Sequence, residues 1–388
     1  MSRLFTKPIT FFFIALIIFS LLTVNAAQSK ELKIGIDEAV NEASVQSNGD
    51  SILVNLFNDQ IITNFDKDEI IEIKNENGLI HLTNDNKKIR GKSLIGPVQL
   101  IPINHNSNVS YKNNWYRGKI TILPIGVDKL TIVNNIDLED YLLSVVPSEM
   151  PHHWHKEALK AQTVAARTYA LGYLGRRKEK GYDLESTVED QVYLGISSEK
   201  KETTKAVQET RGNILVDKKN KPIIALFHSC AGGYTDSIEN VWDNRDMKPS
   251  IHIQPRPDYD DKSPYFKWDR EFNIDETNKL LSNLNIGELK EIIPLKRSIS
   301  QRITKVKLIG SLDTRTLNGD DFRRMLKLPS AKFNFTFENN HITFSGRGYG
   351  HGLGLSQWGA KTLGEKGFNY KQILAHYYPG TKLIIISE

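Results

Sequence analysis

Residues 137–169 read DLEDYLLSVVPSEMPHHWHKEALKAQTVAARTY, and they decide the architecture expected around them. Asp137 is a good N-cap for a helix over 138–146, because its side chain can accept hydrogen bonds from the free N–H groups of the first turn. Asp140 adds a negative charge in that turn, where the helix dipole favours it. Pro147 is expected to end this helix, since proline has no N–H to donate.

A second helix is predicted over about 152–176, so that Glu149 lies in a short link stiffened by Pro147 and Pro151. A carboxyl group in a rigid, apolar link can have a raised pKa, because desolvation disfavours its charged form. Such a group can donate a proton to a leaving glycosidic oxygen. The N-terminus of the second helix would favour the charged form instead. A capping or salt-bridged glutamate remains the alternative interpretation.

Outward from this stretch, the chain is predicted to be an α+β protein with a mostly β core and a few helices. Residues 28–125 read as a small β-rich domain, because short apolar or alternating runs are separated by turn-forming clusters. Residues 126–388 read as a second domain with a variable segment at about 244–340. The strands and the further helix expected are 51–57, 79–83, 98–103, 120–124, 213–216, 223–227, 303–309 and 333–337, with the helix at 277–284.

The N-terminus is typical of an export signal. Arg3 and Lys7 precede an apolar run at 11–24, which small residues at Ala26 and Ala27 follow. The run is short for a membrane span, which needs about 20 apolar residues. Residues 1–27 are therefore predicted to be a signal peptide, or an uncleaved N-terminal anchor. The protein is expected to be periplasmic, in the cell wall, or anchored on the outer side of the membrane.

Composition excludes several classes of protein. The 388 residues are 39% hydrophobic and 25% charged, which is ordinary for a globular protein. The chain has 51 Lys and Arg against 46 Asp and Glu, an excess too small to indicate nucleic-acid binding. A single cysteine, Cys230, excludes an intrachain disulfide. The fold must therefore be stabilised by its core.

The segment FHSCAGGYT, residues 227–235, is predicted to run from a strand into a tight glycine loop. His228 and Cys230 could be metal ligands or a Cys/His nucleophile pair. A zinc site usually needs four ligands, and only one cysteine is present, so zinc is not favoured and no metal or cofactor is predicted. A structural loop with an incidental thiol is the alternative.

The segment SGRGYGHGLGLSQWG, residues 345–359, has glycine at every second position from 346 to 354. It does not fit the dinucleotide fingerprint G-x-G-x-x-G. In an extended conformation one face would be bare backbone, against which another backbone or a sugar chain could pack. Tyr349 and Trp358 could stack on sugar rings, while Arg347, His351 and Gln357 could hydrogen-bond to them. A glycine-rich packing seam in a β-barrel is the alternative.

The long helix carries two further candidates, Gln162 and Arg167. The guanidinium of Arg167 could orient a substrate, or it could form a salt bridge, and its spacing alone favours the salt bridge. His152, His153 and His155 lack the i, i+4 spacing of a shared metal face and are interpreted as surface residues.

Taken together, six segments resemble the stage II sporulation protein D and LytB amidase-enhancer family. They are DYLLSVVPSEMP (140–151), EALKAQTVAARTY (157–169), DQVY (190–193), HSCAGGYT (228–235), GRGYGHGLGLSQWGA (346–360) and ILAHYYPG (373–380). The resemblance covers roughly residues 126–383. Some members of the family resemble metalloproteins with His and Cys ligands near the position of His228.

The resemblance implies a lytic transglycosylase that cuts the linkage between N-acetylmuramic acid and N-acetylglucosamine in peptidoglycan and leaves a 1,6-anhydro end. It implies substrate strands stripped of stem peptides, and an N-acetylmuramoyl-L-alanine amidase as partner. Glu149 matches the catalytic glutamate of the family. The expected substrate contacts are Gln162, Arg167, Ser229, Thr235, Arg347, Tyr349, His351, Gln357 and Trp358. Two alternatives stay open: a non-catalytic glycan-binding activator of an amidase, and a hydrolase built on Cys230 with His228 or His351.

Overall fold

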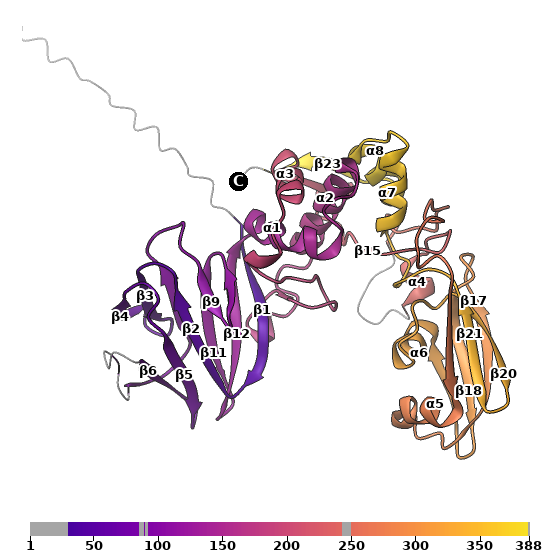
Figure 1. Cartoon of the computed structure of the whole chain (residues 1–388), viewed down its shortest axis with the longest axis horizontal. Helices are drawn as coiled ribbons and strands as arrows, with labels where there is room; N and C mark the ends of the chain where they lie inside the picture. Colours follow the sequence, from indigo (N-terminus) through magenta and orange to yellow (C-terminus); the bar gives the residue numbers. More distant parts are fainter. Residues whose placement is uncertain (1–29, 85–88, 90–91, 243–249, 387–388) are drawn as a thin grey trace, which may run out of the picture.

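A computed structural model describes residues 30–84, 89, 92–242 and 250–386 (Figure 1). The expected export segment, 1–27, lies outside the described residues. Within the described part of the chain, no helix is long and apolar enough to cross a membrane. Strands predominate over helices, which confirms the expected α+β class with a mostly β core.

The N-terminal part forms two packed sheets, on the left of Figure 1. The strands are β1 (Glu31–Val40), β2 (Glu42–Ser47), β3 (Ser51–Asn55), β4 (Gln60–Phe65), β5 (Ile71–Glu76), β6 (Leu79–Asn84), β7 (Lys92–Leu94), β8 (Val98–Pro102), β9 (Val109–Tyr111), β10 (Asn114–Tyr116), β11 (Lys119–Ile125) and β12 (Lys129–Asp137). One sheet has the order β13-β1-β12-β11-β8-β3-β4, where β13 is Leu184–Glu185, and the other has the order β10-β9-β2-β5-β6-β7.

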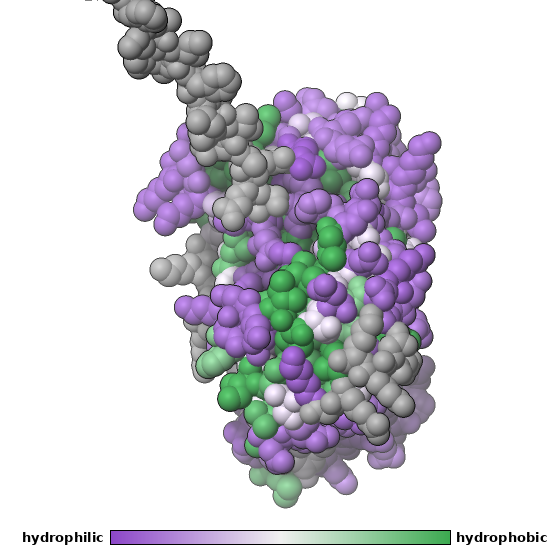
Figure 2. Space-filling model, turned by 90° about the vertical axis from the view of Figure 1, so that its left-hand side faces the viewer, coloured by the Kyte–Doolittle hydropathy of each residue, from purple (hydrophilic) through white to green (hydrophobic). Residues whose placement is uncertain are grey.

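Alternation explains how these strands bury one face. In β3 and β5 every second residue is buried, and the apolar side chains of both sheets join one hydrophobic core. Because β12 pairs with both β1 and β11, this sheet continues past residue 125, where the β-rich region was expected to end. Figure 2 shows hydrophobic residues on the face at the left of Figure 1.

A helical layer follows the sheets. It contains α1 (Leu138–Glu149), α2 (Lys156–Gly172), α3 (Lys201–Glu209), α7 (Gln357–Glu365) and α8 (Tyr370–Tyr377), with the short helices η1 (Lys178–Lys180) and η2 (Ile196–Ser198). α2 packs against the other four α-helices and against β14 (Asn213–Val216), which pairs with β23 (Lys382–Ile385). Elements from the beginning and from the end of the 126–388 region thus pack around α2.

Asp137 caps α1 as expected, accepting hydrogen bonds from the backbone N–H groups of Glu139 at 2.8 Å and Asp140 at 3.3 Å. The prediction that Pro147 ends the helix is wrong. Pro147 lies within the last turn, and the helix continues to Glu149 before Met150 caps it. Pro147 has no N–H to donate to the carbonyl four residues earlier, so the last turn forms without that hydrogen bond.

The second helix also differs from its prediction. α2 begins at Lys156 with His155 as its N-cap, and it ends at Gly172, so 152–155 is a turn and not helix. The strand expected at 223–227 is reduced to β15 (Phe227–His228), which pairs in parallel with β22 (Leu355–Ser356). β14 has the predicted bounds.

The segment from 250 to 346 forms two small three-stranded sheets, on the right of Figure 1. The elements are α4 (Ile238–Val241), which precedes them, β16 (Trp268–Asn273), α5 (Ile274–Leu280), η3 (Ser282–Leu284), β17 (Leu289–Arg297), β18 (Ile303–Gly310), β19 (Thr314–Asn318), α6 (Gly319–Met325), β20 (Phe333–Glu338) and β21 (His341–Gly346). They share a core of their own. The strands predicted at 303–309 and 333–337 are confirmed, whereas the helix predicted at 277–284 begins earlier and breaks at Leu281.

Candidate active site

A groove of about 830 Å³ lies where the helical layer meets the C-terminal sheets. One wall comes from the end of α1, from α2 and from residues 188–190. The other comes from β19 and α6, and the floor from 226–229 and 349–351. Segments that lie far apart in the sequence therefore form one concave surface, large enough for several sugar units of a polymer.

Glu149 is the last residue of α1 and lines this groove. Its Oε1 accepts a hydrogen bond from the backbone N–H of Val192 at 2.9 Å. Burial raises the pKa of Glu149 above its usual value, although hydrogen bonds from Val192 and from the Gln357 side chain oppose the shift. The carboxyl group also lies at the negative end of the α1 dipole, which disfavours its charge. The opposing effect expected from the second helix is weakened, because α2 begins only at Lys156.

The segment 190–193 holds Val192 in place for this contact. Asp190 is buried and accepts hydrogen bonds from Arg176 at 2.7 Å, Arg177 at 2.9 Å and the Tyr169 hydroxyl at 3.1 Å. Sequence reasoning gave this segment no role. Its only signal was its place among the segments of the family resemblance.

Aromatic side chains border the floor of the groove. The rings of His228 and His351 lie 5.4 Å apart, and those of Trp242 and His351 5.3 Å apart. Burial, followed by the nearby Arg323 and Arg302, lowers the pKa of His351 to about 3, so this imidazole is neutral near pH 7. Tyr349 is 46% exposed and presents a ring to the groove.

Six of the residues singled out from the sequence meet at this groove. They are Glu149, His228, Ser229, Tyr349, His351 and Gln357. Glu149 is thus partly buried and lies on the same groove as the glycine-alternating segment. The arrangement supplies a carboxyl group with a raised pKa, aromatic surfaces and hydrogen-bonding groups, with charged side chains such as Arg176 and Arg324 in the lining, which suits a polar carbohydrate.

Comparison with known proteins shows to which family this chain belongs. The stage II sporulation protein family matches residues 127–216, and a domain of unknown function matches 207–354. Stage II sporulation protein D of Bacillus amyloliquefaciens is 35% identical over 266 residues, which are 65% of this chain and 75% of that protein. This chain belongs to the stage II sporulation protein D family.

Two further relatives of this chain have different descriptions. An uncharacterized protein of Brachyspira hyodysenteriae is 33% identical over 281 residues, 69% of this chain and 72% of that protein. The amidase enhancer of Bacillus subtilis is 32% identical over 290 residues, 62% of this chain but only 40% of that protein. The resemblance expected from the sequence, to stage II sporulation protein D and to the amidase enhancer, is confirmed.

The side chain of Arg167 does not line the groove. Its side chain is fully buried in α2, and Nε and Nη2 donate to the two carboxylate oxygens of Glu139, each at 2.7 Å. Burial and pairing leave no donor for a substrate, so its expected role as a substrate contact is wrong and the salt-bridge interpretation is confirmed. Gln162 is also fully buried in α2, against expectation.

Thr235, Arg347 and Trp358 are likewise absent from the groove lining. The Thr235 hydroxyl is buried and donates to the Gln254 carbonyl at 3.1 Å. Trp358 packs against Trp154, with ring centroids 4.7 Å apart. Arg347 lines a separate pocket. Trp358 was expected to stack on a sugar ring, Arg347 to hydrogen-bond to one and Thr235 to contact substrate, but none of the three lines the groove.

The glycine-alternating segment is not the regular extended ribbon that was expected. Gly348, Gly350, Gly352 and Gly354 all have positive φ, between 67° and 102°. A Cβ at Gly348 would lie 2.8 Å from the Cys230 carbonyl oxygen, and one at Gly354 would lie 2.0 Å from that of Leu226. These glycines therefore pack against other parts of the chain, as in the packing-seam interpretation, and the segment's side chains that line the groove are Tyr349, His351 and Gln357.

The groove also contains residues that sequence reasoning missed. Asp320, in α6, is nearly buried and accepts hydrogen bonds from Trp242 Nε1 at 3.1 Å and Arg323 Nε at 2.7 Å. It lies in the part of the chain interpreted as a variable segment. Nothing local in the sequence indicates that this segment lines the same groove as α2.

His228 and Cys230 do not fit a metal site. The Cys230 thiol is buried and donates to Asp260 Oδ2 at 2.9 Å, and burial and the nearby Asp260 raise its pKa. His228 Nδ1 hydrogen-bonds to the Leu353 carbonyl at 3.0 Å. Among the described residues, no group of three or more His, Cys, Asp or Glu side chains could hold a metal ion.

We expect Cys230→Ser to retain full activity on glycan strands, because the thiol is outside the groove and a serine hydroxyl can donate to Asp260 in its place. The measurement is the cleavage rate of purified wild type and variant at equal concentration. A loss of more than about tenfold with an unchanged melting temperature would support the thiol hydrolase instead.

Proposed function

We propose that this protein is a peptidoglycan lytic transglycosylase that cleaves the linkage between N-acetylmuramic acid and N-acetylglucosamine, with Glu149 as general acid and base. The observation that carries the proposal is the raised pKa of Glu149 on the wall of a polymer-sized groove. Membership of the family supports a role at the cell wall. The action is then extracytoplasmic, and the substrate is a glycan strand stripped of stem peptides.

In the proposed reaction, the protonated Glu149 gives its proton to the glycosidic oxygen as the bond from the muramyl anomeric carbon breaks. The resulting carboxylate then takes the proton from the muramyl 6-hydroxyl as that oxygen bonds to the anomeric carbon. The product carries a 1,6-anhydro ring, and the carboxyl group is restored. One acid and base is sufficient, in contrast with the two carboxylates of common glycosidases.

The other groove residues have supporting roles in this proposal. Tyr349 and Trp242 offer rings against which sugar faces can stack. Gln357 hydrogen-bonds to Glu149 and fixes the orientation of its carboxyl group. Ser229 and neutral His351 can hydrogen-bond to hydroxyl or N-acetyl groups without adding charge.

The pH profile tests the role of Glu149. A general acid works only while protonated, so kcat/KM should fall as pH rises through the pKa of Glu149, with a midpoint above the value of 4.5 usual for a glutamate. His351 stays neutral above its pKa of about 3 and does not contribute to this fall. The measurement is the cleavage rate between pH 4 and 9 on denuded strands. A fall with its midpoint below about 4.5 would contradict a protonated Glu149.

A second candidate function is supported by the relative named amidase enhancer. In that case the groove binds glycan without cutting it, and the protein stimulates an N-acetylmuramoyl-L-alanine amidase. The two functions differ in what the purified protein does alone. Fragments released from denuded strands without an amidase support the transglycosylase. No such fragments, together with faster release of stem peptides from intact peptidoglycan by an added amidase, support the activator.

A further inference from the structure

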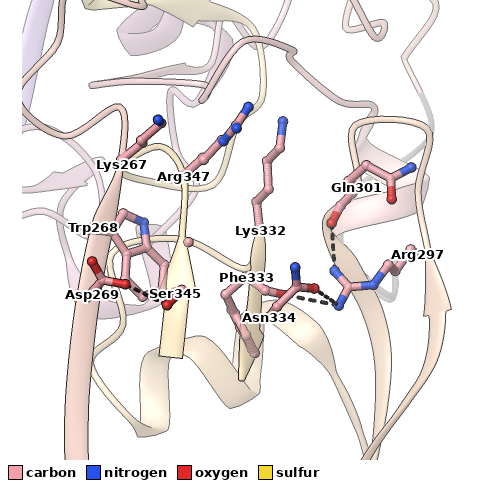
Figure 3. Close-up of a pocket in the computed structure, with 11 residues that line it drawn as sticks. Lys267, Trp268, Asp269, Arg297, Gln301, Lys332, Phe333, Asn334, Ser345 and Arg347 are labelled. Carbon is pink, nitrogen blue, oxygen red and sulfur yellow. Dashed lines mark hydrogen bonds between the residues drawn. The ribbon is translucent and has the colours of Figure 1, made fainter. Parts of the chain in front are cut away.

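A second pocket, of about 440 Å³, lies in the C-terminal sheets and shares no lining residue with the groove. Figure 3 shows it between β16, β21, the start of β20 and the end of β17. Four of its lining residues are cationic and only one is acidic. The cations are Lys267, Arg297, Lys332 and Arg347, and the acid is Asp269.

None of the four cations forms an ion pair within the described part of the chain. Lys332 Nζ donates only to the Gly232 carbonyl, at 2.8 Å, and the Arg347 guanidinium lies 5.6 Å from the centre of the Phe266 ring. Asp269 is held by the Ser345 hydroxyl, which donates to its Oδ1 at 2.5 Å. The pocket therefore keeps a positive charge that its own residues do not neutralise.

Three of the cationic ends point the same way. In Figure 3 Lys267, Arg347 and Lys332 extend side by side toward one side of the pocket, and Arg297 lies at its far edge. Arg297 is fixed there, because it donates to the Gln301 and Phe333 carbonyls at 3.0 Å each. Like charges that are gathered in this way repel one another unless an anion joins them.

The surroundings of Lys332 disfavour its charge. Burial, then Arg302 outside the pocket and Arg347 within it, lower its pKa to about 8. An anion in the pocket would oppose that shift. A further donor lies beside the cations: Trp268 Nε1 is buried and has no hydrogen-bond partner among the described residues. The absence of a side chain at Gly346 lets this indole lie across β21, since a Cβ there would come within 2.2 Å of the ring.

We propose that this pocket binds a phosphate group, supplied by a phosphodiester polymer, by a lipid headgroup or by free phosphate. The four cations come from four different segments of the chain, three of them side by side and Arg297 at the far edge, so the several oxygens of one phosphate group can contact more than one cation. The Arg347 fork can bind two phosphate oxygens, and the lysines act as point charges. The inference does not depend on the chemistry of Glu149.

The test is isothermal titration calorimetry of the full chain with four probes. They are inorganic phosphate, oligo(glycerol phosphate), vesicles of phosphatidylglycerol with phosphatidylcholine vesicles as the neutral reference, and polyglutamate of matched charge. We expect at least one phosphate probe to bind, more weakly at high salt. The probe that binds most tightly identifies the source of the phosphate.

Variants locate the binding. Lys267→Gln and Arg347→Gln should each weaken it by about tenfold, since each removes a charge-assisted contact. Asp269→Asn should strengthen it several-fold, because it removes the one repelling charge and keeps the acceptor for Ser345; misfolding cannot produce such a gain. Lys279→Gln and Lys305→Gln remove exposed charges of the same region outside the pocket and should leave affinity unchanged.

The proposal is overturned if no phosphate probe binds, if the pocket variants and the two control variants weaken binding equally, or if Asp269→Asn does not strengthen it. Polyglutamate binding as tightly as the best phosphate probe would overturn the assignment of phosphate. Because binding is measured without cleavage, an inactive wild-type protein would refute the proposed transglycosylase and leave this result unaffected.

Discussion

Glu149→Gln is expected to abolish glycan cleavage and to leave the protein folded and able to bind the strand. Glutamine has the shape of the protonated glutamate, and its amide oxygen can still accept the hydrogen bond from Val192. It has no proton to give to the leaving oxygen. General acid and base catalysis is worth about 10²–10⁴-fold, so we expect a loss of at least that size in kcat. Rates on denuded strands and co-sedimentation with them measure the two properties separately.

Glu189→Gln is the matched control for this experiment. Glu189 lines the same groove, but its side chain is 58% exposed and contacts only Arg324, at 3.7 Å. Its carboxylate is solvated, so removal of its charge should change the rate by no more than a few-fold. Equal losses in the two variants would mean that general charge in the groove, and not a proton on Glu149, governs the rate.

Arg167→Met is expected to destabilise the protein by about 3–5 kcal/mol, because it leaves the buried carboxylate of Glu139 without its partner. Glu139 lies in the first turn of α1 and Arg167 in α2, so the pair joins the two helices that position Glu149. The measurement is the free energy of unfolding from urea titrations. Catalytic activity per folded molecule should persist, since neither side chain lines the groove.

Two control variants distinguish the cost of breaking a buried ion pair from the cost of breaking a solvent-exposed one. The double variant Arg167→Met with Glu139→Met removes both charges and should recover much of the loss. Lys180→Met breaks the pairs that this half-exposed lysine forms with Glu38 and Glu185, and it should cost less than about 1 kcal/mol. A cost below 1 kcal/mol for Arg167→Met would show that Glu139 is not held as the structure has it.

Local signals in the sequence predicted the local structure. Asp137 was found as an N-cap because capping depends on neighbouring residues alone, and alternation in 51–57 and 98–103 gave strands for the same reason. Pro147 misled because the absence of its N–H removes one hydrogen bond, yet the helix continues two residues further, to Glu149. The start of α2 was predicted too early, because 152–155 forms a turn before the helix begins at Lys156.

Long-range contacts could not be predicted in the same way. Glu149 was singled out correctly as a groove residue, but its partner Val192 lies 43 residues away, and Asp320 comes from the segment interpreted as variable. Arg167 was misplaced because a guanidinium suits a substrate and a buried carboxylate equally well, and only burial decides between them. The positive φ of four alternate glycines depends on how closely 226–232 approaches them.

The central claim is that this protein alone cuts glycan with a proton from Glu149. Mass spectrometry of the products from denuded strands and the purified protein, without an amidase, tests it most directly. The account predicts fragments that end in 1,6-anhydro-N-acetylmuramic acid, with none from Glu149→Gln. Fragments that end in ordinary reducing N-acetylmuramic acid, anhydro fragments from the variant, or no fragments from the wild type would contradict it.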